Sequence, residues 1–235
     1  MSKILVVQHQ SDCPPGWFGD WLLEEGCQLD VRRPDRGEPV GATPQHVGVV
    51  VLGGSPNAHD DESAPWLAAV RALCADALAR EVPLLGICLG HQLLAVSVGG
   101  RSVRNPDGQQ IGVLPMGWTE TAGADPLLAS LPAVAVQWNH DIVVGLPESV
   151  QVLARAAGGE VQAARFGPTA WGLQCHPEAG AQICAAWAEH DRGEYAARGE
   201  DVSAYVDGVR VAEVALADAW RPVATAFSRL VRSRS

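Results

Sequence analysis

The chain has 235 residues, of which 47% are hydrophobic and six are cysteines, and its formal net charge is -10. This length is sufficient for one large domain with its own core, and the negative charge argues against a nucleic-acid-binding surface, which needs clustered Lys and Arg. No apolar run reaches the ~20 residues that cross a bilayer. The cysteines are widely spaced and form no Cys-x-x-Cys, so they indicate neither a zinc site nor a disulfide framework.

The first half of the chain alternates between strand and helix patterns. The N-terminus leads directly into a strand instead of a signal peptide, so we expect a cytoplasmic protein. A Pro- and Gly-rich stretch at 33–46 reads as a loop, and the continuous apolar runs that follow it are typical of buried parallel strands. The predicted elements are strands at 3–8, 27–31, 47–52 and 83–87 and helices at 16–25, 64–80 and from 89 onward.

The second half begins with several short β-runs separated by Gly and Pro. They lie at 102–104, 110–116, 134–138, 151–156, 162–166 and 170–174, and they are followed by helices at 179–190 and 202–231, the latter as one or two helices. These patterns predict an α/β fold: an open, mostly parallel, doubly wound sheet with helices on both faces and added antiparallel strands. We expect a single domain over 1–235, with a C-terminal helical extension at about 190–235.

Cys88 stands between a predicted buried strand and a predicted helix, with Gly86 and Gly90 on either side. This is the layout of a nucleophile elbow, with cysteine in the position of the nucleophile. The helix begins near Leu89, so its free amide groups and its dipole favour a thiolate. The pattern therefore predicts an activated nucleophile, the alternative being a cysteine buried as a small hydrophobic residue.

A cysteine nucleophile needs a base, and the base needs an orienting partner. The stretch 174–178 reads Gln-Cys-His-Pro-Glu and directly follows a predicted strand. Parallel strands bring their carboxyl ends to one edge of the sheet, so His176 is expected to face Cys88 while Glu178 binds the far ring nitrogen.

The tetrahedral intermediate of such a reaction carries an oxyanion that N–H groups must meet. The amide of Leu89, next to the nucleophile, is one expected donor. Gly54, in the turn after the strand at 47–52, is the second, because glycine lets the backbone approach closely. The alternative for Gly53-Gly54 is an ordinary strand-to-helix turn.

Four motifs, in this order, resemble class I (triad) glutamine amidotransferases, in particular their stand-alone GMP-synthase-like branch. They are Gly-Gly-Ser-Pro at 53–56, Gly-Ile-Cys-Leu-Gly-His-Gln at 86–92, Gln-Trp-Asn-His-Asp at 137–141 and Gln-Cys-His-Pro-Glu at 174–178. The resemblance covers about residues 45–180 and implies a flavodoxin-like glutamine amidotransferase fold. It also implies that Cys88 is the nucleophile, His176 the base and Glu178 its orienting residue.

The resemblance further implies how the substrate is held and what reaction follows. Cys88 attacks the side-chain amide of L-glutamine, ammonia leaves, and water releases glutamate from a γ-glutamyl thioester, with no metal or organic cofactor. The residues implied to contact the substrate are Gly53, Gln92, Asn139, His140 and Asp141.

Three questions remain open at this level. The chain carries no ATP-binding motif of the Gly-x-x-x-x-Gly-Lys-Ser/Thr type, so ammonia would be passed to a separate synthetase subunit, or the enzyme is instead a γ-glutamyl hydrolase or peptidase. A catalytically silent binding module is a third reading, because one fold serves many functions. The aromatic-rich C-terminal segment is expected to pack on the sheet, to cover the active site or to form a homodimer contact.

The remaining histidines are not assigned to the reaction. His91 follows the elbow on the helix, where we expect a packed or solvent-facing position. The histidines expected at the surface, because no partner is recognisable, are His9, His46, His59 and His190.

Overall fold

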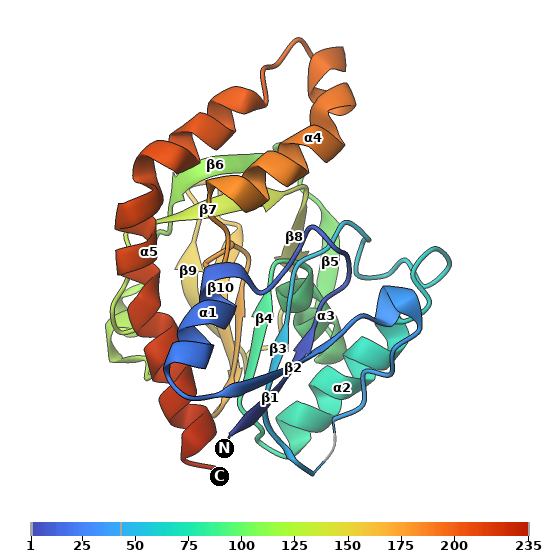
Figure 1. Cartoon of the computed structure of the whole chain (residues 1–235), viewed down its shortest axis with the longest axis vertical. Helices are drawn as coiled ribbons and strands as arrows, with labels where there is room; N and C mark the ends of the chain where they lie inside the picture. Colours follow the sequence, from blue (N-terminus) through green and yellow to red (C-terminus); the bar gives the residue numbers. More distant parts are fainter. Residues whose placement is uncertain (1, 43, 235) are drawn as a thin grey trace.

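The computed structural model describes residues 2–42 and 44–234 (Figure 1). Met1, Thr43 and Ser235 lie outside the described residues, so the predicted loop at 33–46 is described on either side of Thr43. In this part of the chain the main sheet has seven strands. In spatial order they are β2 (Gln28–Arg32), β1 (Lys3–Val7), β3 (His46–Val51), β4 (Leu84–Ile87), β11 (Ala170–Leu173), β10 (Val161–Gly167) and β9 (Gln151–Arg155).

The five strands from β2 to β11 run parallel, and β10 and β9 continue the sheet in antiparallel fashion. This confirms the predicted fold class. Because alternate residues of a strand point to opposite faces, each central strand serves two cores. Ile4 and Val6 pack on one face of the sheet, whereas Leu5 and Val7 pack on the other.

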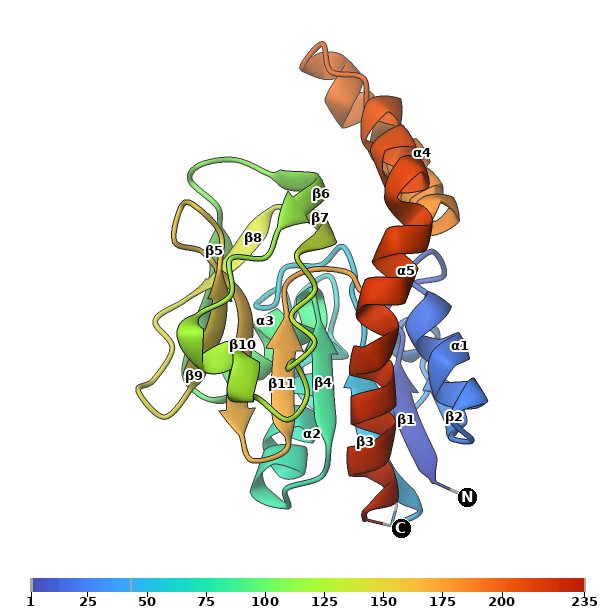
Figure 2. The same cartoon turned by 90° about the vertical axis from the view of Figure 1, so that its left-hand side faces the viewer.

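Helices cover both faces (Figure 2). One core is closed by α2 (Leu67–Ala79) and α3 (Leu89–Ser97), and the other by α1 (Gly16–Glu24), α4 (Ala181–Ala197) and α5 (Ser203–Arg232). The short 3-10 helices are η1 (Pro34–Arg36) and η2 (Glu120–Ala124). No helix among the described residues combines the length and apolar character needed to span a membrane.

The remaining strands correct one expectation. They do not extend the main sheet: β5 (Arg101–Arg104) pairs with β8 (Asp141–Val144), and β6 (Gln110–Pro115) pairs with β7 (Val134–Asn139), as two separate antiparallel ribbons. Strand β8 was not expected from the sequence, because it is only four residues long and starts two residues after β7 ends. Tertiary contacts decide its pairing, since a run of that length has little periodicity of its own.

The C-terminal segment is built into the molecule. Figure 2 shows α4 and the first turns of α5 projecting beyond the strand ends, after which α5 runs back along the face of the sheet. Trp220, Phe227 and Val231 on α5 are buried in the core shared with α1. Gly48 in β3 makes room for this helix, since a Cβ there would lie 2.7 Å from Val231 Cγ2.

Candidate active site

Cys88 occupies the sharp turn between β4 and α3. Its backbone has φ of 51° and ψ of -107°, in the region that non-glycine residues rarely adopt. Small neighbours make this turn feasible, because a Cβ on Gly90 would lie 2.1 Å from the Val51 carbonyl oxygen and one on Gly86 would lie 2.5 Å from the Gly90 carbonyl oxygen. The strained turn holds Cys88 at the carboxyl edge of the sheet.

His176 and Glu178 follow β11, the strand next to β4. His176 Nδ1 lies 2.7 Å from Glu178 Oε1, and both side chains are buried. His176 Nε2 has no hydrogen-bond partner among the described residues. A Cβ on Gly53 would lie 3.0 Å from His176 Cε1 and 3.5 Å from Cys88 Cβ, so Gly53 places the two side chains together. The structure thus brings together the three residues that the sequence nominated.

Gln174 is a neighbour of the sulfur that was not assigned from the sequence. Its Nε2 donates a hydrogen bond to Cys88 Sγ at 3.6 Å, and the side chain is fully buried. An N–H donor at this position stabilises negative charge on sulfur. Its place two residues before His176 was the only available signal.

The pKa of His176 is set by opposing effects. Burial lowers it, but the electrostatic interactions and hydrogen bonds with Glu178 and Cys88 outweigh burial and raise the pKa to about 10. An imidazole that is protonated at neutral pH places a positive charge beside the sulfur and carries a proton for a leaving group.

This raised pKa predicts a pH-dependent contribution to stability. A pKa raised from 6.5 to about 10 means that protonated His176 stabilises the fold fully below pH 6.5 and that this contribution is lost as the pH rises toward 10. The melting temperature of the wild type should therefore exceed that of His176→Gln by a margin that shrinks from pH 6.5 to pH 10. His190→Gln, at an exposed position, is the control. A margin that stays constant over this range would contradict a protonated His176.

Gly54 and Leu89 also lie next to each other. A Cβ on Gly54 would lie 3.1 Å from Leu89 Cδ2 and 2.9 Å from His9 Cβ. Both backbone segments end at the sheet edge that carries Cys88, Gly54 after β3 and Leu89 at the first turn of α3. The turn after β3 therefore packs tightly between His9 and the elbow.

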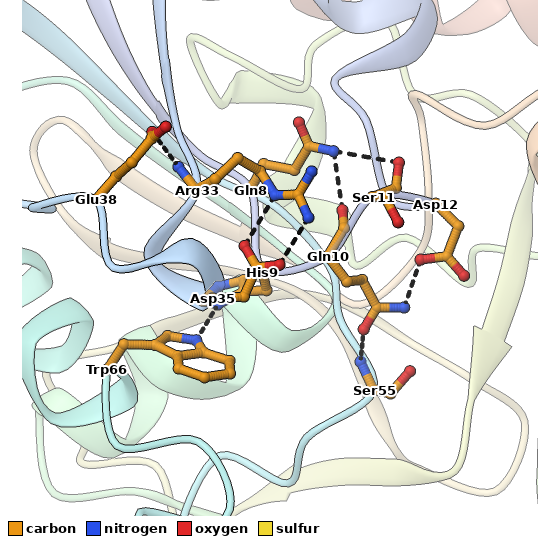
Figure 3. A network of polar contacts seen from close by, with 10 residues as sticks. All are labelled: Gln8, His9, Gln10, Ser11, Asp12, Arg33, Asp35, Glu38, Ser55 and Trp66. Atoms are coloured by element: carbon orange, nitrogen blue, oxygen red, sulfur yellow. Dashed lines mark hydrogen bonds and ion pairs between the residues drawn. The ribbon is translucent and has the colours of Figure 1, made fainter.

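A polar network supports this turn (Figure 3). The side-chain oxygen of Gln10 accepts a hydrogen bond from the Ser55 amide at 2.7 Å, and Gln10 Nε2 donates to Asp12 Oδ1 at 2.8 Å. Beside it, Trp66 Nε1 donates to His9 Nδ1 at 3.2 Å. The loop after β1 thus holds the loop after β3, an arrangement between distant segments that no local motif signals.

Two expectations about histidines were wrong. His9 is 1% exposed and His46 is 6% exposed. Burial lowers the pKa of His9 to about 4, against a smaller opposing effect of Asp35, so His9 packs as a neutral ring. His46 is the first residue of β3, and its Nε2 lies 3.0 Å from Asp30 Oδ2. Of the two positions expected for His91, packed or solvent-facing, the structure shows the packed one: His91 is fully buried against Phe166.

Gln10 offers a test of this support. Replacing it with Ala removes the acceptor of the Ser55 amide next to Gly54, and one such hydrogen bond is worth about 1 kcal/mol. We expect kcat/KM for the predicted amide hydrolysis to fall by about tenfold, chiefly through kcat, and the melting temperature to fall by no more than about 2–4 °C. The control is Gln151→Ala, at an exposed position of β9. An unchanged kcat would show that the turn is held without Gln10.

A cavity of about 290 Å³ opens at Cys88, near the lower end of the range for ligand sites. Its walls include His176, Gly54 and four of the five residues predicted to contact substrate, which are Gln92, Asn139, His140 and Asp141 but not Gly53. Gly53, Leu89 and Glu178 stand behind this surface. Among the described residues, no group of three or more His, Cys, Asp or Glu side chains is arranged to hold a metal ion.

The predicted contact residues are held by hydrogen bonds. Gln92 Nε2 donates to the Asp141 carbonyl oxygen at 3.3 Å, and Asn139 Nδ2 donates to the same oxygen at 3.1 Å. The Asp141 carboxylate accepts from Asn57 Nδ2 at 2.7 Å and lies 3.6 Å from Arg104 Nη1. These contacts join the start of β8 to α3 and to the loop after β3.

The other wall of the cavity is α4, which belongs to the C-terminal segment that was expected, as one of three alternatives, to cover the active site. Trp187, His190, Asp191 and Glu194 line it. Their spacing of i, i+3, i+4 and i+7 places them on one face of the helix. The ring centroids of Trp187 and His176 are 4.6 Å apart, so the first residue of this helix face packs against the predicted base.

Known proteins share this architecture. The chain is similar to the structure of a glutamine amidotransferase from Thermotoga maritima, with 26% identity, a TM-score of 0.86 and coverage of 98% of both chains. It is also similar to the glutamine amido transferase from Methylobacillus flagellatus, with 25% identity, a TM-score of 0.87 and coverage of 98% of this chain and 95% of that one.

Similar sequences point the same way. A putative glutamine amidotransferase-like protein, YfeJ, from Salmonella typhimurium is 26% identical over 83% of each chain. A glutamine-hydrolysing GMP synthase from Aeropyrum pernix is 36% identical over 58% of this chain, which spans only 25% of that protein. The family model for glutamine amidotransferase class-I matches residues 20–183, well over half of the sequence. The chain therefore belongs to the class I glutamine amidotransferase family.

Proposed function

We propose that this protein hydrolyses γ-glutamyl amides, L-glutamine among them, through Cys88, His176 and Glu178. The observation that carries the proposal is the strained Cys88 turn beside a buried His176–Glu178 pair whose outer imidazole nitrogen has no partner among the described residues. Such a nucleophile, base and orienting carboxylate are the parts that acyl transfer requires.

In the proposed first half-reaction, Cys88 Sγ attacks the amide carbon of the substrate. The amides of Gly54 and Leu89 receive the oxyanion. His176 then gives the Nε2 proton to the departing nitrogen, the C–N bond breaks, and a γ-glutamyl thioester remains on Cys88. Glu178 keeps the ring oriented and stabilises its positive charge.

Water completes the reaction. His176, now neutral, takes a proton from the attacking water, the C–S bond breaks, and glutamate leaves with Cys88 restored. The proposed contacts of the glutamyl group are Gly53, Gln92, Asn139, His140 and Asp141. No step in this scheme calls for a metal or an organic cofactor.

What receives the ammonia is a separate matter. A glutamine-hydrolysing GMP synthase subunit from Halobacterium salinarum is 36% identical over 45% of this chain and is, by its name, one part of a larger enzyme. In one version of the proposal, by analogy with this subunit, a separate synthetase chain in the cytoplasm receives the ammonia. The second version is a hydrolase with a larger leaving amine, and the wall that α4 adds to the cavity favours it.

The test is the release of glutamate and free amine by the purified protein from L-glutamine and from a panel of γ-glutamyl amides. Activity on glutamine, removed by Cys88→Ala, supports the glutaminase version. Faster hydrolysis of a larger amide supports the hydrolase version. If no amide is cleaved and Cys88 does not react with a thiol label, the protein is a binding module and the proposal fails.

A further inference from the structure

We propose that the α4 wall of the cavity is a leaving-group subsite for a cation, so that the preferred substrates are γ-glutamyl amides whose amine carries a second positive charge. This inference rests on the proposed function and specifies its substrate class. A diamine joined through one nitrogen to the γ-carboxyl group of glutamate is the simplest compound of this kind.

The path of the leaving group follows from the place of His176. The group that protonates the departing nitrogen must lie beside it, and Trp187 packs 4.6 Å from the His176 ring. Trp187 Nε1 also donates to the Asp12 carbonyl oxygen at 2.8 Å. An amine that leaves past His176 therefore enters the space between Asp12 and the face of α4 that begins with Trp187.

The charges in this space are mostly negative. Asp191 accepts a hydrogen bond from Trp138 Nε1 at 3.0 Å, and Asp12 accepts one from Gln10 Nε2 at 2.8 Å. Both donors are neutral, and within residues 2–42 and 44–234 neither carboxylate belongs to an ion pair of the structure. Two carboxylates without a cation, beside an indole face, form a suitable site for an ammonium group.

The other ionisable groups of the cavity do not cancel this charge. Glu194 Oε1 is paired with Arg198 Nη1 at 2.6 Å. Arg104 is paired with Asp141, with 3.6 Å between Arg104 Nη1 and Asp141 Oδ1. His140, between the two sides, has a pKa lowered by burial and by Arg104, against the raising effects of the nearby carboxylates, and so favours its neutral form. His190 lies on the cavity face of α4 and is exposed.

Two buried polar atoms in the cavity wall indicate where the parts of a substrate lie. His176 Nε2 and Asn139 Oδ1 make no hydrogen bond within the described part of the chain, although the residues are 4% and 3% exposed. Buried polar groups are normally satisfied, so Asn139 Oδ1 points to a group of a substrate, whereas His176 Nε2 faces Cys88 and the nitrogen that departs. Asn139 lies toward Arg104 and Asp141, which places the glutamyl end there and the leaving amine on the side of Asp191.

The reaction of such a substrate balances without a further reagent. The amide C–N bond breaks as His176 supplies one proton, and the diamine leaves with its second ammonium group on Asp191 and Asp12. Water then hydrolyses the thioester. Ammonia, by contrast, has no second group for these carboxylates to bind.

The experiment compares three substrates: the γ-glutamyl amide of a four-carbon diamine, the γ-glutamyl amide of butylamine, and L-glutamine. We expect kcat/KM for the charged amide to exceed that of the neutral amide by about tenfold, which corresponds to about 1.4 kcal/mol. Asp191→Asn should reduce this ratio toward one, because asparagine can still accept from Trp138 but has no charge. Glu189→Gln, at an exposed position of the same helix, should leave the ratio unchanged.

A second measurement does not depend on the variant. The free diamine should inhibit hydrolysis more strongly than butylamine does, and added salt should weaken this difference. Equal kcat/KM for the charged and neutral amides would overturn the inference while leaving the proposed function intact. An equal loss on all three substrates in Asp191→Asn would also overturn it, by placing Asp191 at the glutamyl ammonium group. Hydrolysis of none of the three would overturn both.

Discussion

Cys88→Ala is expected to lower amide hydrolysis by about four orders of magnitude or more, because the nucleophile is lost and the remaining groups act only on bound substrate and water. Cys88→Gly should be equally inactive but more stable than Cys88→Ala by about 1 kcal/mol. The reason is the positive φ at this position, which glycine adopts without strain. Activity and the free energy of unfolding, measured on both variants, check the two parts separately.

The matched control is Cys74→Ala. Cys74 is also fully buried, on α2 in the opposite core, and burial alone raises the pKa of its thiol to about 12. This variant should lose some stability through the smaller side chain but keep kcat. Activity retained by Cys88→Ala would show that another group is the nucleophile, and equal stability of the glycine and alanine variants would contradict a strained turn.

Trp220→Ala is expected to destabilise the whole protein by about 3–5 kcal/mol. Trp220 is 1% exposed on α5, its ring packs 6.5 Å from that of Trp118, and its Nε1 donates to the Val134 carbonyl oxygen at 3.0 Å. The substitution leaves a cavity and removes a partly buried hydrogen bond between α5 and β7. Each kcal/mol lowers the melting temperature of a chain of this size by roughly 2–4 °C.

Val211→Ala serves as the control for this prediction. Val211 lies on the same helix but is 91% exposed, so its replacement should change stability by less than about 0.5 kcal/mol. If Trp220→Ala melts only α5 and leaves the strands folded, the helix is not needed for the stability of the sheet. A cooperative loss of all structure would show that α5 and the sheet form one folding unit, as a single domain requires.

Short-range patterns in the chain were enough to predict the fold class and to nominate the reactive residues. Continuous apolar runs such as β3 and β4 predict buried parallel strands, and the glycines around Cys88 predict a tight turn. His176 could be paired with Cys88 because parallel strands deliver their carboxyl ends to one edge. These inferences need only local periodicity and a general rule of topology, and both can be applied to a single amino-acid sequence.

The surroundings of these residues became visible only once the elements were packed together. His9 and Gln10 support the turn at Gly54 and Ser55 from 45 positions away, and Trp187 reaches the His176 ring from a helix with only a weak amphipathic pattern. Such contacts depend on the relative placement of elements, which the periodicity of one segment does not encode. The charge of the leaving-group wall follows from the same placement, because Asp12 and Asp191 become neighbours of one cavity only when α4 packs across the strand ends.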